Sequence, residues 1–155
     1  MYIRSYNLSE EIVREIGRFA ILWNCFENTF LRCECSAGQI RNQYVNIYID
    51  KSSQVEFAKA LNNRLRNFHI SVQEYVDDRL HPALADPSNP ANKQAMKDFI
   101  EQRGEDNRLG CLLIIYRLRC NMMHGLKEIY DLNNQLELFS TMNDVLESIR
   151  RLPLC

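Results

Sequence analysis

Glycine and proline are scarce in this 155-residue chain, which has five of the first and four of the second. This scarcity argues against β-sandwiches and barrels, whose many turns need these residues, and it favours helices. Neither sign of charge dominates, because 19 Lys and Arg against 20 Asp and Glu give a net charge of −1. The chain therefore cannot coat nucleic acid by bulk positive charge, and any such contact requires a local basic patch.

Long apolar runs are missing as well. The longest, at 19–23 and 111–116, are far shorter than the roughly 18 residues that cross a bilayer. The first six residues lack the basic stretch and apolar core of a secretion signal. We therefore expect a cytoplasmic protein with no membrane partner, whose six cysteines stay reduced and behave as small hydrophobic groups.

Apolar residues recur every three or four positions near the start of the chain, the spacing that gives a helix one apolar face. Asn7 and Glu10 form a capping-box pattern at the beginning of this helix. The apolar stripe that follows consists of Ile12, Ile16, Phe19, Trp23, Phe26 and Phe30. The pattern predicts a long amphipathic helix that ends near residues 35–38.

Further helices are expected downstream. Residues 39–50 fit a short helix, although 44–49 could also form a strand; we favour the helix because no partner strand is evident nearby. The other expected helices begin at Ser52 or Ser53 and run to about Leu80, begin near Asn92 with a pause at 103–104, and begin near Asp131. A proline-rich loop at 81–92 interrupts them. The sequence predicts an all-α single domain, residues 1–155, built as a bundle of four to six helices.

Residues 109–118 are apolar on nearly every side of the helix that they predict. Such a helix must be covered all round, so it is either the centre of the bundle or it also packs on a second subunit. The segment 103–127 has five basic and two acidic residues, a local balance of 5 − 2 = +3. This focused charge suits a phosphate site; alternatively, Arg117 and Arg119 extend to solvent and His124 interacts with the helix C-terminus.

The segment Arg119-Cys120-Asn121-Met122-Met123-His124 resembles the Arg-x4–6-His signature of the HEPN superfamily of helical ribonucleases. Its setting is similar too, because Gly125, the basic Lys127 and one final amphipathic helix follow it. Glu27, one turn after Trp23, resembles the aromatic–Glu pattern of the first helix in many members; it either reaches the site or is solvated. The chain departs from the family at Cys120, where members often have a polar residue, and at Leu126, where AMPylated members have tyrosine.

The resemblance implies a metal-independent endoribonuclease that needs no cofactor. Its catalytic pair would be Arg119 and His124, supported by Arg117, Asn121, Glu27 and Lys127. Histidine can give or take a proton near neutral pH, and arginine matches two phosphate oxygens with a planar fork. The resemblance further implies a homodimer whose two motifs share a cleft. It also implies a toxin or antiviral-defence role against a cellular RNA such as tRNA or mRNA, with an antitoxin or defence-system partner.

Several alternatives stay open at this point. On an ideal helix, positions 119 and 124 lie about 140° apart, so either the helix loosens before His124 or Arg117, which also satisfies the spacing, shares the site. A non-catalytic HEPN-like module that binds RNA or protein is the alternative function, and a purely structural helical adaptor is a third. The pair Cys33 and Cys35 lacks the further ligands that a metal site needs.

Overall fold

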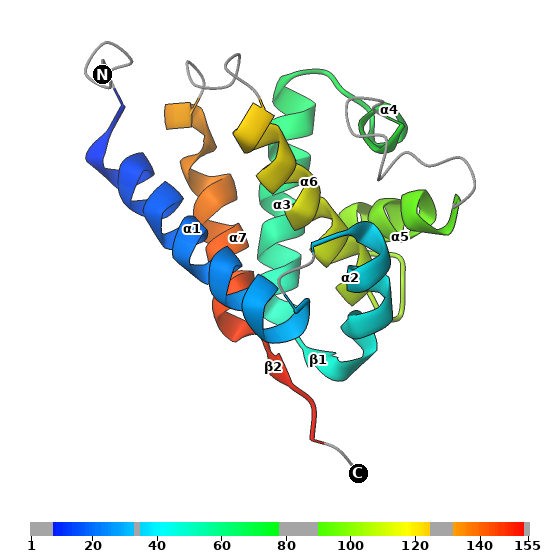
Figure 1. Cartoon of the computed structure of the whole chain (residues 1–155). Helices are drawn as coiled ribbons and strands as arrows, with labels where there is room; N and C mark the ends of the chain where they lie inside the picture. The colour runs from blue at the N-terminus through cyan, green and yellow to red at the C-terminus, as the bar shows by residue number, and fades with distance from the viewer. Residues whose placement is uncertain (1–7, 33–34, 78–89, 125–131, 154–155) are drawn as a thin grey trace.

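The computed structural model describes residues 8–32, 35–77, 90–124 and 132–153, and of residues 121–124 it describes the backbone alone. Seven α-helices and one short two-stranded sheet make up this part of the chain (Figure 1). In order they are α1 (Glu10–Phe30), α2 (Ala37–Gln43), a 3-10 turn (Tyr44–Asn46), β1 (Ile47–Tyr48), α3 (Lys51–Asn67), α4 (Val72–Val76), α5 (Pro90–Glu101), α6 (Arg108–His124), α7 (Leu136–Ser148) and β2 (Arg150–Arg151). The predicted all-α single-domain bundle is confirmed, with seven helices rather than four to six.

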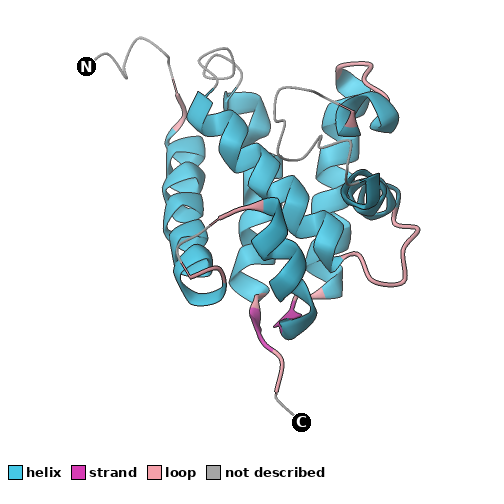
Figure 2. Ribbon diagram, turned by 45° about the vertical axis from the view of Figure 1, so that its right-hand side comes forward, coloured by secondary structure: helices cyan, strands magenta, loops and turns pink. Residues whose placement is uncertain are grey.

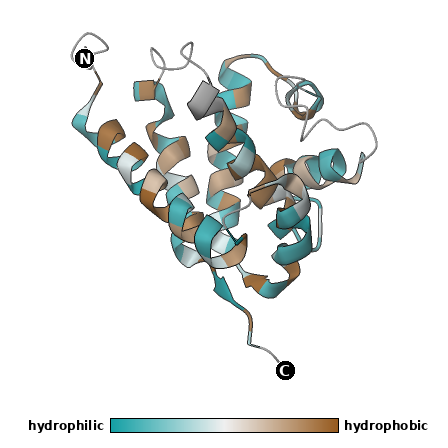
Figure 3. Cartoon of the chain, in the orientation of Figure 1, coloured by the Kyte–Doolittle hydropathy of each residue, from teal (hydrophilic) through white to brown (hydrophobic). Residues whose placement is uncertain are grey.

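Helix α6 runs through the middle of the bundle, and its residues 111–115 are each 0% exposed. Helices α2 and α5 pack directly on it, and α7 lies between α1 and α3. In Figure 3, hydrophobic residues gather on the helix faces that meet inside the bundle. Of the two alternatives for residues 109–118, the central helix is right. A single chain already covers its apolar surface, so that surface gives no argument for a second subunit.

Helix α1 begins at Glu10, two residues before its first buried residue, Ile12. Ser9 caps it, since the Ser9 side chain accepts a hydrogen bond from Ile12 N; the expected cap, Asn7, lies outside the described residues. The predicted stripe is confirmed: Ile12, Phe19, Trp23 and Phe26 are buried, and Ile16 and Phe30 are partly buried against the same core. The helix ends at Phe30, shorter than expected, because a new capping residue, Ser36, starts α2 soon afterwards.

The prediction of a single helix that runs to about Leu80 is wrong. Asp50, rather than Ser52 or Ser53, caps α3, and the helix ends at Asn67. His69 then adopts a left-handed conformation with φ of 55°, and Ile70 N bonds back to Leu65 O at 2.9 Å. This arrangement satisfies the last carbonyls of the helix and turns the chain into α4. The apolar spacing continues through the break, which is why periodicity alone did not reveal it.

The prediction of a helix over residues 39–50 is correct only for its first part. Residues 37–46 are helical, but Ile47 and Tyr48 form a strand that pairs antiparallel with Arg151 and Arg150 (Figure 2). Leu152 N also donates to Asn46 O at 2.9 Å. The partner strand lies about a hundred residues further along the chain, beyond the last helix, so no local pattern could reveal the pairing.

The last two helix predictions agree with the structure in their main features. The expected pause at 103–104 separates α5 from α6, and α7 buries Phe139, Met142 and Leu146 of the expected stripe. Helix α7 begins at Leu136 after a 3-10 turn at 132–135, a little later than expected. Across the described segments, no helix combines the length and the apolar character needed to span a bilayer.

Helices α5 and α6 approach each other most closely at Gly110. A Cβ atom at this position would collide with the Ala95 carbonyl and would lie 2.8 Å from Phe99 Cβ. We expect Gly110→Ala to lower the free energy of unfolding by about 1–3 kcal/mol, because the added methyl overpacks a rigid helix contact. Urea denaturation followed by circular dichroism measures this change.

The matched control is Gly17→Ala on α1, where an added Cβ meets nothing within 4 Å. This variant should gain about 0.5–1 kcal/mol, because alanine is the better helix former. Equal effects of the two substitutions would contradict the close α5–α6 contact.

Candidate functional site

Arg119 lies where three separate elements meet. It is half-buried on α6, and its guanidinium is a charged neighbour of the Cys35 thiol, which directly precedes α2. The carboxylate of Glu27, on α1, is the other charged neighbour of the same thiol. The structure therefore brings Glu27 and Arg119, two of the residues singled out from sequence, to one place.

Aromatic packing joins α1 to α6 at the same point. The rings of Trp23 and Tyr116 are nearly parallel, with 13° between their planes and 6.4 Å between their centres. On α1 itself, Trp23 also packs against the rings of Phe19 and Phe26, at 6.2 and 5.2 Å. The Tyr116 hydroxyl is hydrogen-bonded to the Cys120 thiol, one turn along α6. The indole nitrogen of Trp23 is buried and has no hydrogen-bond partner within the described segments. This packing fixes the position of α1 relative to the half-buried Arg119.

Burial keeps two of the groups near Arg119, Cys35 and Tyr116, protonated at neutral pH. Burial raises the pKa of the Cys35 thiol to about 12; Glu27 raises it further and Arg119 opposes the shift. Burial, together with the thiols of Cys120 and Cys35, raises the pKa of Tyr116 to about 12 as well. At neutral pH the Tyr116 phenol and the Cys35 thiol near the guanidinium are therefore uncharged, and the carboxylate of Glu27 is a charged group beside the same thiol. This arrangement can bind and orient an anion such as a phosphate group.

Arg117 belongs to another side of the helix. Two residues correspond to a rotation of about 200°, so Arg117 and Arg119 project in nearly opposite directions. Arg117 is only 1% exposed, and its guanidinium lies 4.5 Å from the centre of the Tyr75 ring on α4. The structure does not bring Arg117 to Arg119; instead Arg117 packs α4 against the core.

His124 is the last residue of α6, and the helix is continuous from Arg108 to this point. The helix does not loosen before His124, so an ideal α-helix puts the two residues about 7.5 Å apart along the axis and about 140° apart around it. The side chains of Asn121 and His124, and the whole of Lys127, lie outside the described residues. Within the described part, no three His, Cys, Asp or Glu side chains group closely enough to hold a metal ion.

Comparisons with protein-family models, with curated proteins and with solved structures find no match to this chain. The resemblance described from the sequence therefore rests on the residues of the motif and on their setting.

Sequence reasoning did not identify Cys35, Tyr116 or Cys120 as neighbours of Arg119. Tyr116 lies three residues before Arg119, and Cys120 lies four residues after Tyr116. Residues at these spacings share a helix face, and that spacing was the available signal. No sequence signal placed Cys35 there, because its position depends on how the chain crosses from α1 to α2.

The alkylation rate of Cys35 reports on this arrangement, because the thiolate is the reactive form. Glu27→Gln removes a negative charge beside the thiol, so its pKa should fall and its reaction with iodoacetamide should become faster. Arg119→Gln removes a positive charge, so the pKa should rise and the reaction should become slower. Timed alkylation at pH 9, with mass spectrometry of the Cys35 peptide, measures both rates.

Glu11→Gln, an exposed charge change in the first turn of α1, is the control and should leave the Cys35 rate unchanged. If Glu27→Gln and Arg119→Gln shift the rate in the same direction, the two groups do not act on this thiol as opposite charges.

Proposed function

We propose that this protein is a metal-independent endoribonuclease of the HEPN type, in which Arg119 and His124 act on the RNA phosphate. The observation that carries this proposal is the position of Arg119, which is half-buried beside the Cys35 thiol that Glu27 also faces. The other candidate arginine, Arg117, is buried over Tyr75. The arginine of the motif is thus the one that a phosphate could reach.

The reaction is a transesterification within the RNA strand. The 2′-hydroxyl loses its proton and its oxygen attacks the adjacent phosphorus, while the bond from phosphorus to the 5′-oxygen breaks and that oxygen takes up a proton. The products are a 2′,3′-cyclic phosphate and a 5′-hydroxyl. In this proposal the imidazole of His124 transfers protons, and the fork of Arg119 holds the non-bridging oxygens as negative charge develops on them.

The proposed active assembly is a two-fold dimer. One chain supplies one copy of the motif, and positions 119 and 124 of a continuous α-helix are about 140° apart around its axis. A two-fold axis would bring His124 of one protomer to Arg119 of its partner. We further propose a toxin or antiviral-defence role in the cytoplasm, with a cellular RNA such as tRNA or mRNA as substrate and an antitoxin or defence-system protein as partner.

The direct test is cleavage of single-stranded RNA in the presence of EDTA. Arg119→Ala and His124→Asn should each reduce the rate by about two to four orders of magnitude, the usual contribution of a charge stabiliser or of an acid–base group. The matched controls are Arg66→Ala and His69→Asn, which alter an exposed arginine and an exposed histidine at the end of α3. Both control variants should cleave as the wild type does.

Two results would overturn the proposal. In one, the wild-type protein leaves RNA intact in EDTA while it still binds RNA, which is the behaviour of a non-catalytic module. In the other, the Arg119 and His124 variants cleave as fast as the two controls.

A mixing experiment tests whether the site is shared between chains. Arg119→Ala and His124→Asn proteins, each inactive alone, should regain about a quarter of wild-type activity after dissociation and joint reassembly. Half of the dimers would then be mixed, and each mixed dimer would have one complete site out of two. No recovery, with dimer exchange verified by native mass spectrometry, would contradict a site built from both chains.

A further inference from the structure

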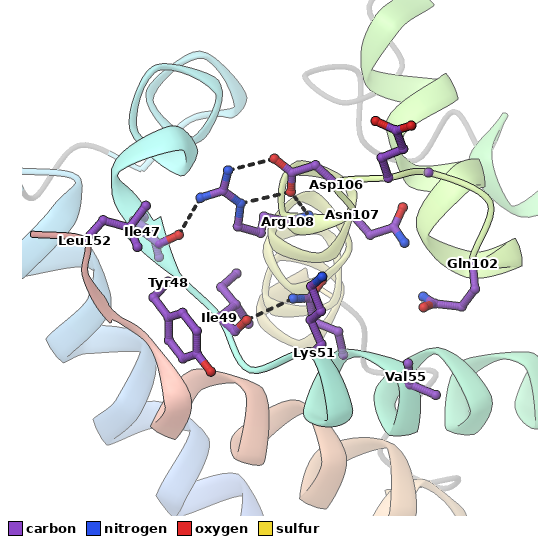
Figure 4. A pocket seen from close by; sticks show the side chains of 13 residues that line it. Ile47, Tyr48, Ile49, Lys51, Val55, Gln102, Asp106, Asn107, Arg108 and Leu152 are labelled. Carbon is purple, nitrogen blue, oxygen red and sulfur yellow. Dashed lines mark hydrogen bonds and ion pairs between the residues drawn. The ribbon is translucent and has the colours of Figure 1, made fainter.

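The two-stranded sheet lies at the lower end of the bundle in Figure 1, where α3 and α6 also begin (Figures 1 and 4). A cavity of about 490 Å³ opens between these elements, and Tyr48, Lys51 and Arg108 are among the residues that line it. Arg108 closes one side, because its Nη1 donates to Ile47 O at 2.7 Å and its Nη2 pairs with Asp106 at 2.7 Å. The cavity therefore has a rigid wall built from β1 and the start of α6.

Three cations beside this cavity are exposed and available. Lys51 is the first residue of α3, and Arg150 and Arg151 form β2; all three are exposed. None of them forms a direct ion pair with a carboxylate in the part of the chain that the structure describes, whereas Arg18, Lys93 and Arg108 do. Lys51 and Arg150 are nevertheless close enough to Asp106 and Asp50, respectively, to help lower the pKa of those carboxyl groups. Exposed cations that are not held in a direct ion pair can contact a polyanion.

Aromatic rings stand beside two of these cations. Tyr48 and Arg150 are direct cross-strand partners, and the guanidinium of Arg150 lies 4.8 Å from the centre of the Tyr48 ring. On the other side of the strand, the Arg151 guanidinium lies 5.0 Å from the Phe30 ring, and its Nη2 donates to Thr29 O. The guanidinium groups thus lie over these rings, and nucleic-acid bases stack on arginine and on tyrosine.

Most acidic side chains at this end of the bundle already accept hydrogen bonds from neighbouring residues. The Asp50 carboxylate accepts hydrogen bonds from Ser53 N and Ser53 Oγ, and that of Asp106 accepts them from Arg108. These bonds lower the pKa of both carboxyl groups. Glu105 lines the cavity as a further acid. The N-termini of α3 and α6 add positive partial charge on the opposing side, since both helices begin at this cavity.

A segment of the chain without acidic residues runs from this end of the bundle to the Arg119 site. Residues 35–49, which run from the neighbour of Arg119 through α2 to β1, contain no Asp or Glu. Helix α2 packs along α6. Arg108 and Arg119 are eleven residues apart, so they lie on the same side of α6 at about 16 Å along its axis. Stacked nucleotides spaced about 3.4 Å apart would cover this distance in about five steps.

We propose that Tyr48, Lys51, Arg150 and Arg151, here called the sheet surface, bind single-stranded RNA outside the cleavage site. Bases stack on the Tyr48–Arg150 pair, and phosphates contact Lys51 and the two arginines. The strand then continues over α2 towards Arg119. The choice of RNA among polyanions rests on the proposed function, because RNA is the substrate assigned to the Arg119 site.

Binding of an RNA that cannot be cleaved tests the sheet surface by itself. The probe is a fluorescein-labelled twelve-nucleotide RNA with 2′-O-methyl sugars, titrated with the full chain in EDTA and followed by fluorescence anisotropy from 50 to 300 mM KCl. Lys51→Gln and Arg150→Gln should each weaken binding about fivefold at low salt and should each reduce the slope of log K against log salt by about 0.7. Lys59→Gln, an exposed cation further along α3, is the matched control and should change neither quantity.

The outcomes separate this inference from the nuclease proposal. The proposal that the sheet surface binds RNA is overturned if the Lys51, Arg150 and Lys59 variants bind the probe equally, or if the wild type does not bind it. Either result holds whatever the cleavage assay gives. Displacement of the RNA by polyglutamate of equal charge as effectively as by unlabelled RNA also overturns it, because the partner would then be an acidic protein. Weakened binding in the Lys51 and Arg150 variants supports RNA binding at the sheet surface, even if the wild type fails to cleave ordinary RNA. That failure would contradict only the proposed nuclease activity.

Discussion

The burial of α6 is the constraint on which the rest of the structure depends. Residues 111–115 have no exposed surface, so every neighbouring element must cover this helix. Gly110 lets α5 approach its first turn, α2 lies along it, and Trp23 of α1 stacks on Tyr116. A helix held on all sides presents its polar residues at fixed places. Arg108 binds β1 at one end through the Ile47 carbonyl, and further along Arg119 is an electrostatic neighbour of Cys35, which directly precedes α2.

The electrostatics of the chain are local rather than global. The whole protein has a net charge of −1, yet its arginines occupy distinct environments. Arg18 binds three carboxylates on α1 and α7, and Arg117 packs over the partly buried Tyr75 ring. Arg119 lies near the protonated Cys35 thiol and Tyr116 phenol, with the Glu27 carboxylate beside the same thiol. Only the last environment combines a cation with partial exposure and uncharged hydrogen-bond donors. This combination is what makes Arg119 suited to a phosphate group.

Periodicity predicted the parts of the fold that depend on burial of one helix face. The stripes of α1 and α7 and the pause before α6 follow from spacings of three and four residues. Features set by contacts distant in sequence were not predictable in the same way. The strand at Ile47 and Tyr48 needs a partner from the chain's last residues, and the end of α3 depends on a left-handed His69 inside an unbroken apolar pattern.

The candidate site was predictable in part for the same reason. The motif singled out Arg119, and the aromatic–Glu pattern singled out Glu27; the structure places both beside Cys35. Cys35 itself could not be predicted, since it reaches the site through the connection from α1 to α2. Spacing alone did not distinguish Arg117 from Arg119, because both satisfy the motif; the burial of Arg117 over Tyr75 depends on the packing of α4, which no local pattern predicted.

The chemistry of the RNA ends tests the central claim most directly. A defined oligonucleotide incubated with the protein in EDTA and analysed by mass spectrometry should yield fragments with a 2′,3′-cyclic phosphate and fragments with a 5′-hydroxyl, because the attacking oxygen comes from the RNA itself. Fragments with a 3′-hydroxyl and a 5′-phosphate, or an oligonucleotide that stays intact, would contradict the account.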